Sequence, residues 1–411
     1  MHMADSEPVL IVGAGMAGLS CARTLQDAGV PFLLFDSDEE VGGRVRTDEV
    51  DGYRLDRGFQ VLLTAYPEAR KFLDYGGLDL KACYPGSRVW FGGRFHRVAD
   101  PFRHPIDGIM SLGNPIGSLL DKVRVGLMRT GLRSTKSMPD DLSTLGALSK
   151  LGFGPVMIDR FWKPFMRGVF LENELSTTVR KFEETFRLFA LGDTVLPRLG
   201  IGELPKQMAG KLPKDSLALG TEITKVETRA IESADGKRFE GRAVVLATDL
   251  DPANRLLGIE GKPSQWNAVD CLYFSLPEDQ LPTSEPILHL DGTGEDPVNN
   301  LTFVSTLCDC APSGRSLAST SVIGRQETER EELAQEVLGQ LETWFGKGIE
   351  WEFVKGYRIR QAVPSTPVAT VPDPVVNGIH RCGDYCGLPS IDAAMRSGRE
   401  TAERIINDHT N

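Results

Sequence analysis

The sequence predicts an α/β fold in which the two ends of the chain build one domain and the residues between them supply a second. Two observations lead to this prediction. A short apolar run, a glycine-rich turn, a helical stretch and another apolar run follow one another at the N-terminus. A glycine–aspartate pair and an amphipathic helix stand about 370 residues later. Strands that alternate with helices favour a parallel sheet covered by helices.

The N-terminal turn joins the apolar run 9–12 to a helical stretch, 19–28, that Gly29 ends. Its residues are Gly13, Ala14, Gly15, Met16, Ala17 and Gly18. Glycines at this G-x-G-x-x-G spacing allow a tight turn and a close approach of backbone to a pyrophosphate at the helix N-terminus. The second run, 31–35, ends on Asp36, which can accept hydrogen bonds from a ribose. The motif therefore predicts a Rossmann-like dinucleotide site. The alternative, a turn that binds nothing, leaves Asp36 unexplained.

The residues after Asp36 and Ser37 carry a family resemblance. The run Gly42-Gly43-Arg44-Val45-Arg46-Thr47 resembles the FAD-binding segment of the superfamily of flavin-containing amine oxidases, phytoene desaturases and protoporphyrinogen oxidases. The resemblance implies bound FAD, with Gly42, Gly43 and Arg44 along its phosphates and ribityl chain. It also implies that Gly58, Phe59 and Gln60 lie close to the flavin.

Near the C-terminus, Gly383 and Asp384 resemble the pair that contacts the ribityl and phosphate region in this superfamily. The alternative for Asp384 is an ordinary turn acid. Ser390 is a suitable N-cap, and Ile391, Ala394 and the apolar residues after them recur at helical spacing. The resemblance implies that this helix points its N-terminus at the flavin, where it would stabilise the negative charge of the reduced cofactor.

A third part of the FAD-binding domain is expected in the middle of the chain. Residues 217–227 alternate as a strand, 230–239 form a hairpin and 242–248 read as a buried strand. The resemblance places the backbone of Val226 at the adenine. The predicted FAD-binding domain therefore consists of 4–80, 191–265 and 365–411. Residues 81–190 and 266–364 would form an α+β substrate domain of mixed sheet and helices.

Composition narrows the function. The net charge of −11 argues against general nucleic-acid binding. No apolar stretch approaches the roughly 18 residues that span a bilayer. Seven cysteines without a C-x-x-C pair indicate the cytoplasm or an equivalent reducing compartment. The six histidines do not cluster at metal-ligand spacing, so no metal site is expected.

Two missing features bear on the chemistry. The stretch 299–306 corresponds to the strand that carries a lysine near flavin N5 in amine oxidases, and it contains none. A Gly-Gly-Cys attachment motif is also missing, which favours non-covalent FAD. No catalytic residue can be assigned, and the electron acceptor stays open between oxygen and a quinone.

The segment 88–136 carries nine basic and three acidic side chains, a local charge of +6. Within it, Ile116, Leu119, Leu120, Val123 and Leu127 form a helical apolar stripe. A basic amphipathic helix can lie on an anionic membrane, so residues 101–136 are a candidate for peripheral membrane contact and for admitting an apolar substrate. The alternative is a surface helix packed on its own domain.

Three functions therefore remain at this point. The first is an FAD-dependent oxidoreductase that oxidises or desaturates an apolar small molecule, polyene or tetrapyrrole-like, by hydride transfer to flavin N5. The second is an amine oxidase that lacks the usual lysine. The third is a flavin-dependent isomerase or a degenerate flavin-binding module without redox turnover.

Overall fold

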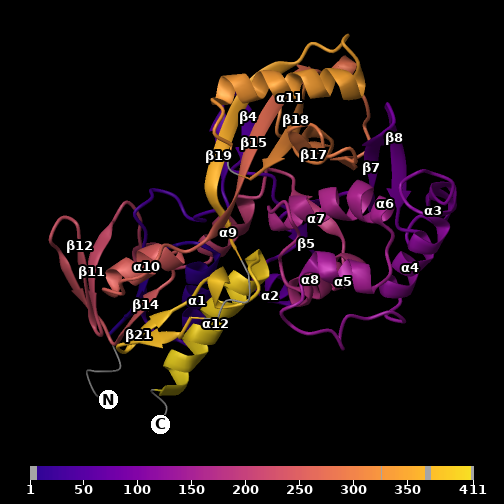
Figure 1. The fold of residues 1–411 in the computed structure, drawn as a ribbon. Helices are drawn as coiled ribbons and strands as arrows, with labels where there is room; N and C mark the ends of the chain where they lie inside the picture. The colour runs from indigo at the N-terminus through magenta and orange to yellow at the C-terminus, as the bar shows by residue number, and fades with distance from the viewer. Residues whose placement is uncertain (1–6, 325, 366–371, 409–411) are drawn as a thin grey trace.

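A computed structural model describes residues 7–324, 326–365 and 372–408 (Figure 1). A mostly parallel sheet forms its nucleotide-binding-type half. The strands, in order across the sheet, are β10 (Leu217–Ala218), β2 (Phe32–Phe35), β1 (Val9–Val12), β14 (Ala243–Leu246), β21 (Ile379–Arg381) and β20 (Val375–Val376). The last pair is antiparallel. Strands β1 and β14 are buried along their whole length, as expected for a parallel sheet covered on both faces.

Helices cover one face of this sheet and a small antiparallel sheet covers the other. The helical layer consists of α1 (Met16–Asp27), α12 (Ile391–Asp408), α2 (Pro67–Phe72) and α9 (Glu203–Ala209). The opposite layer consists of β11 (Ile223–Glu227), β12 (Ala230–Ser233), β13 (Arg238–Glu240) and α10 (Leu250–Leu256). The strand expected over 217–227 is thus two strands, because Gly220 turns the chain with φ +67° after it leaves the parallel sheet.

Helices α1 and α12 pack closely although they come from opposite ends of the chain (Figure 1). The Ser20 hydroxyl donates to the Met395 carbonyl over 2.9 Å. A Cβ at Gly398 would lie 2.0 Å from the Ala17 carbonyl oxygen, so only glycine permits this approach. The C-terminal helix therefore supports the helix that follows the glycine-rich turn.

A second, larger sheet forms the other half of the molecule. The order of its strands is β19 (Glu352–Pro364), β15 (Trp266–Pro277), β18 (Arg315–Ile323), β17 (Val298–Phe303), β16 (Leu288–Asp291), β7 (Gly86–Phe91) and β8 (Arg94–Ala99). It is mixed, because β16 and β7 run parallel while the other neighbours are antiparallel. The helix α11 (Arg330–Phe345) covers its outer face (Figure 1).

Helices between β8 and β9 (Thr194–Pro197) lie against the inner side of this half. They are α3 (Pro105–Ser111), α4 (Leu119–Arg129), α5 (Thr144–Lys150), α6 (Pro155–Met157), the π-helix η2 (Ile158–Trp162), α7 (Lys163–Phe170) and α8 (Val179–Leu191). The hairpin β3 (Thr47–Val50) and β4 (Tyr53–Asp56) and the small sheet of β5 (Leu62–Leu63), β9 and β6 (Leu80–Ala82) connect the halves. The two-domain division stays a prediction, and β6 crosses its first boundary between residues 80 and 81.

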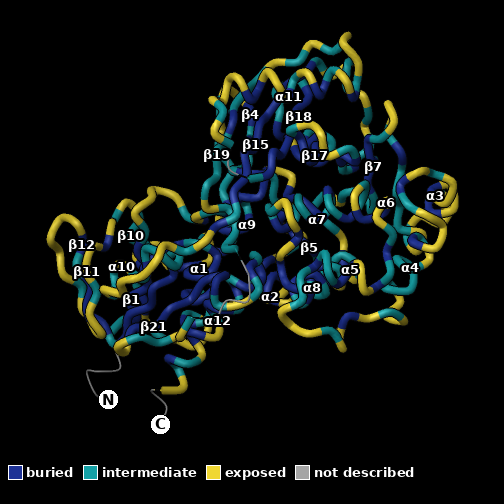
Figure 2. The backbone as a smooth tube through the Cα atoms, in the orientation of Figure 1, coloured by how far each residue is buried: buried dark blue, intermediate teal, exposed yellow. Residues whose placement is uncertain are grey.

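The apolar stripe expected along 116–127 is only partly a helix face. Ile116 precedes α4 and is buried, whereas Leu119, Leu120 and Val123 project into solvent. Figure 2 shows exposed residues along α3 and α4 at the edge of the molecule. Helix α4 therefore packs on its own domain through Val125 and Met128 and not through these three residues. Within the described ranges, no helix is long and apolar enough to cross a membrane.

Candidate functional site

A single cavity of about 1950 Å³ runs between the two halves of the molecule. It begins at the glycine-rich turn after β1, passes the start of α12 and continues beneath the inner face of the larger sheet to α3 and α4. Cavities for one small ligand usually measure roughly 300–1,000 Å³. The volume is therefore sufficient for a dinucleotide together with a second molecule.

The three glycines of the turn are required for different reasons. Gly13 has φ +110°, and a Cβ at Gly18 would lie 1.9 Å from the Gly13 carbonyl oxygen. Gly15 has an ordinary φ of −73°, and its Cβ would meet no atom of the described chain within 4 Å. Folding thus explains Gly13 and Gly18 but not Gly15, which borders the cavity at the N-terminus of α1.

The Asp36 carboxylate is held at the end of β2 by the loop it faces. One oxygen accepts from the Ala14 N–H over 2.6 Å, and the other accepts from the Asp38 N–H over 2.9 Å. Each carboxylate oxygen has further acceptor capacity, and Asp36 lines the cavity. The residue therefore fixes the glycine-rich turn and still presents an acceptor to a ligand.

Arg44 joins three segments of the chain at the cavity wall. Its guanidinium donates to Asp384 over 2.7 Å and to the Ala362 carbonyl over 3.0 Å, and it lies 3.2 Å from Asp249. Burial opposes the charge of Arg44, but Asp384 and then Asp249 outweigh burial and raise its pKa. Burial raises the pKa of Asp249, while Arg44 opposes that rise. The arginine is therefore permanently charged and fixed in place.

Sequence reasoning missed Asp249. The residue directly precedes α10, and it follows β14 at the carboxyl edge of the parallel sheet, where ligands of such sheets usually bind. That position could have identified Asp249 from the sequence.

Asp56, which shortly precedes the predicted flavin contacts Gly58, Phe59 and Gln60, does not line the cavity. It accepts from the Thr47 hydroxyl over 2.6 Å and from the Ile201 N–H over 3.0 Å, and burial raises its pKa to about 6.

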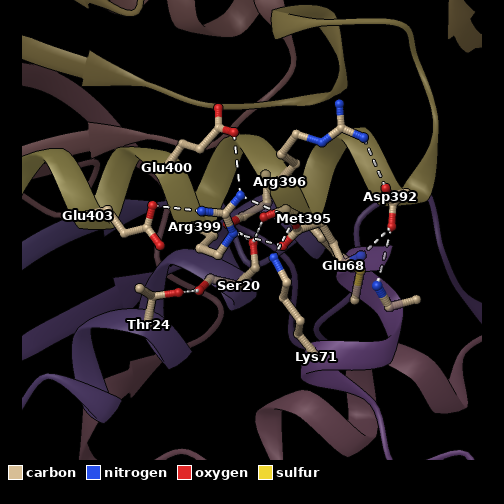
Figure 3. A network of polar contacts seen from close by, with 12 residues as sticks. Ser20, Thr24, Glu68, Lys71, Asp392, Met395, Arg396, Arg399, Glu400 and Glu403 are labelled. Atoms are coloured by element: carbon tan, nitrogen blue, oxygen red, sulfur yellow. Dashed lines mark hydrogen bonds and ion pairs between the residues drawn. The ribbon is translucent and has the colours of Figure 1, made fainter. Parts of the chain in front are cut away.

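The start of α12 is fixed from both sides. Ser390 caps the helix by accepting from the Ala393 N–H over 3.0 Å, as predicted. Asp392 in the first turn accepts from the Glu68 N–H over 2.8 Å and so caps α2. Figure 3 shows how Arg399 then reaches back to Glu68, with Lys71 and Glu403 completing the network. The helix N-terminus that borders the cavity is therefore held rigidly.

The cavity wall contains most of the residues expected to bind FAD. They are Gly13, Gly15, Met16, Ala17, Asp36, Ser37, Gly42, Gly43, Arg44, Gly58, Phe59, Gln60, Gly383, Asp384, Ser390, Ile391 and Ala394. Ala14, Gly18 and Val226 do not line it. Ala14 and Gly18 are buried, and the segment around the start of β11 borders the cavity at 221–224, before Val226.

The far part of the cavity is an apolar chamber. Its wall includes Phe161, Trp162, Phe165, Phe170, Phe186 and Phe189 from η2, α7 and α8. Strand β17 contributes Asn300 and Thr302 in place of a lysine. The one buried lysine of this wall in the described chain is Lys181 on α8, a residue that the sequence did not single out.

The residues at the glycine-rich end fit FAD. The open space beside Gly15, the unpaired N–H groups expected in the first turn of α1 and the Asp36 carboxylate match a diphosphate and a ribose. The rigid N-terminus of α12 lies further along the same wall. Fold and site thus define a Rossmann-type α/β protein whose nucleotide compartment opens into an apolar chamber.

The chain belongs to the family of flavin containing amine oxidoreductases, whose model matches residues 16–406. Membership implies a flavin cofactor and a small-molecule substrate. The 15-cis-phytoene desaturase of Capsicum annuum is 23% identical over 465 residues, which cover 98% of this chain and 78% of the relative.

Shorter sequence matches and structural matches also occur. The coproporphyrinogen III oxidase of Propionibacterium freudenreichii is 26% identical over 172 residues, 39% of this chain and 31% of the relative. The first curated relatives are thus matched over about a third of their length or less. A solved putrescine oxidase bound to putrescine has a TM-score of 0.72 at 16% identity and covers 98% of this chain and 99% of its own. That likeness concerns the fold alone.

Proposed function

We propose that the protein binds FAD non-covalently and oxidises or desaturates an apolar small molecule, polyene or tetrapyrrole-like. The observation that carries this proposal is the continuity of the cavity from Gly15 to the aromatic chamber. FAD in the first part would place its ring between the halves, beside the second part. The similarity to a phytoene desaturase and a coproporphyrinogen III oxidase supports the two substrate classes.

In this proposal the residues of the chain mainly bind the cofactor and orient the substrate. Asp36 accepts from the adenosine ribose, the turn at Gly15 receives the diphosphate, and Arg44 and Asp384 border the ribityl chain. The bound flavin supplies the hydride acceptor, N5. The apolar chamber excludes water and presents a C–H bond of the substrate to the ring.

Non-covalent binding is supported by the position of the cysteines. Cys382 and Cys386 lie next to the predicted site, but neither lines the cavity, and burial raises the pKa of both thiols. Neither is therefore a ready nucleophile. Acid precipitation of the purified protein should leave the yellow flavin in the supernatant. Flavin that stays with the pellet would rule out this part of the proposal.

The substrate is proposed to enter at α3 and α4. Phe102, Ile109 and Leu112 are exposed to solvent and also line the cavity, so its mouth is apolar. Ile106 and Met110 beside it are 76% and 74% exposed. A contiguous apolar surface of this kind is typical of contact with a membrane or a partner. Peripheral contact with a lipid surface would deliver an apolar substrate directly to this mouth.

The charge of this surface is smaller than the sequence count suggests. Arg88, Arg97, Arg103, Arg124 and Arg129 are all engaged in ion pairs. Two of their partners, Asp193 and Glu285, lie outside 88–136 and were not in that count. The proposed membrane contact therefore depends mainly on apolar side chains and little on anionic lipid.

The decisive experiment is anaerobic reduction of the FAD-loaded protein by a panel of candidate substrates. Loss of the flavin's visible absorbance with polyenes or reduced tetrapyrroles, and not with amines, is the expected result. Reduction by amines alone would favour an amine oxidase without the usual lysine. A protein that binds FAD but is reduced by no member of the panel would favour an isomerase or a binding module.

A further inference from the structure

Lys181 is a buried lysine in the cavity wall that the proposed function leaves without a task. It stands on α8, and its side chain is 11% exposed. Lysine is seldom buried in proteins, because its ammonium loses hydration. Desolvation accordingly lowers the pKa of Lys181, while Glu184 and Asp384 oppose that change.

The position of Lys181 relates α8 to the start of α12. Its Nζ lies 3.5 Å from Oε2 of Glu184 one turn later. The other oxygen of Glu184 lies 4.0 Å from Nη2 of Arg396 on α12. Lys181 thus lies on the part of α8 that faces Arg396 in the second turn of α12, and Ser390 and Ile391 at the start of that helix line the same cavity.

An ion pair that merely stabilises α8 does not account for this lysine. A distance of 3.5 Å exceeds that of a charge-assisted hydrogen bond, about 2.7–2.9 Å. At the same spacing, Lys71 and the buried Glu68 approach to 2.9 Å, while the lysine stays 54% exposed outside the cavity. Glu184 therefore accepts only a long hydrogen bond from one of the three N–H donors of Lys181.

We propose that Lys181 is a positioning residue that, together with the N-terminus of α12, stabilises negative charge on the flavin ring after reduction. This inference rests on the proposed FAD site. It assigns a buried lysine on α8 to the flavin. This lysine lies at a different place in the cavity wall from strand β17, which contains no lysine. Negative charge on the ring would in turn favour the protonated form of Lys181.

The test is the midpoint potential of the bound flavin, which reports the ratio of affinities for reduced and oxidised FAD. Lys181→Met should shift this ratio at least tenfold toward oxidised FAD, about 30 mV for a two-electron couple. Lys181→Arg should retain most of the parental value, and Lys206→Met, at an exposed lysine of α9 that forms an i,i+3 ion pair outside the cavity, should leave it unchanged. A purely structural lysine would not move the potential in this pattern.

A ratio within about twofold of the parent in Lys181→Met would overturn the inference. If that variant does not retain FAD, Lys181→Gln, which keeps a hydrogen-bonding side chain, is measured against the same criterion. Failure of the parent protein to bind FAD would instead refute the proposed function. The two failures are therefore distinguishable.

Discussion

Replacing Gly15 by alanine tests whether the glycine-rich turn is shaped for a ligand or for the fold. The new Cβ would meet no described atom within 4 Å, and φ of −73° suits any residue. Alanine at a helix N-cap costs about 0.5 kcal/mol more than glycine. It also restricts the unfolded chain, which stabilises by roughly 0.4–1 kcal/mol. The free energy of unfolding without FAD should therefore change by less than about 1 kcal/mol.

FAD binding should respond very differently. A methyl group at the N-terminus of α1 displaces the diphosphate and weakens at least one hydrogen bond to a charged oxygen, worth roughly 1.5–3 kcal/mol. That corresponds to about a tenfold to hundredfold loss of affinity. Gly18→Ala is the contrasting variant, because its Cβ overlaps the Gly13 carbonyl at 1.9 Å and should cost about 3 kcal/mol of stability.

The assays are urea unfolding of the deflavinated protein and titration of the same protein with FAD. Gly15→Ala should unfold like the parent and bind FAD weakly. If it were instead as unstable as Gly18→Ala, Gly15 would be a folding residue. If it bound FAD like the parent, no phosphate would approach this position, and the assignment of the turn would be refuted.

Three further predictions concern Asp36, the surface at α3 and α4, and a buried histidine. Asp36→Ala should lower FAD affinity about tenfold to hundredfold and also destabilise the deflavinated protein by about 1–3 kcal/mol, because Ala14 N–H loses its acceptor; unchanged affinity in the titration would reduce Asp36 to a loop residue. The double variant Ile106→Ser, Met110→Ser should lower co-sedimentation with liposomes at least tenfold, with little effect of salt. The control Ile259→Ser, at an exposed residue beyond α10, should leave co-sedimentation unchanged. Equal binding by the parent and both variants would exclude this surface as a membrane contact. Burial lowers the pKa of His289 to about 3 from 6.5, so the unfolded chain takes up a proton below pH 6.5 while the folded protein does not. The free energy of unfolding should therefore fall by about 2 kcal/mol between pH 7 and 5. In urea unfolding at both pH values His289→Leu should remove that part of the pH dependence, and an unchanged pH dependence would contradict this prediction.

Local signals in the sequence predicted the glycine-rich end of the site well. Regular spacing and capping residues fix such features, so the strand 9–12 and the N-cap at Ser390 were found where expected. The helix expected over 19–28 spans Met16–Asp27, because the last residues of the glycine-rich turn already belong to its first turn. The family resemblance supplied Arg44 and Asp384, which the structure brings together at 2.7 Å although 340 positions separate them.

The remainder depends on tertiary contacts that no local pattern encodes. The periodicity of 116–127 predicts an apolar helix face, but periodicity cannot tell whether that face meets protein or solvent, and Leu119 and Leu120 meet solvent. The alternation of apolar and polar residues across 217–227 likewise predicts one strand and does not reveal the turn at Gly220. Val226, beyond that turn, does not line the cavity. No sequence pattern identified Lys181, because a lysine in an amphipathic helix is normally interpreted as a surface residue.

The packing of α1 against α12 has a consequence for the synthesis of the protein. The Ser20 hydroxyl donates to the Met395 carbonyl, and the backbone at Ala17 packs closely against Gly398. At synthesis rates of roughly 5–20 residues per second, the first helix waits on the order of 20 to 80 s for the last one. During that interval the face of α1 that packs on α12 stays uncovered, although β1, β2 and α9 can already cover the rest. We expect cofactor binding to follow translation, because a chain that stops before residue 391 lacks the helix that supports its glycine-rich turn.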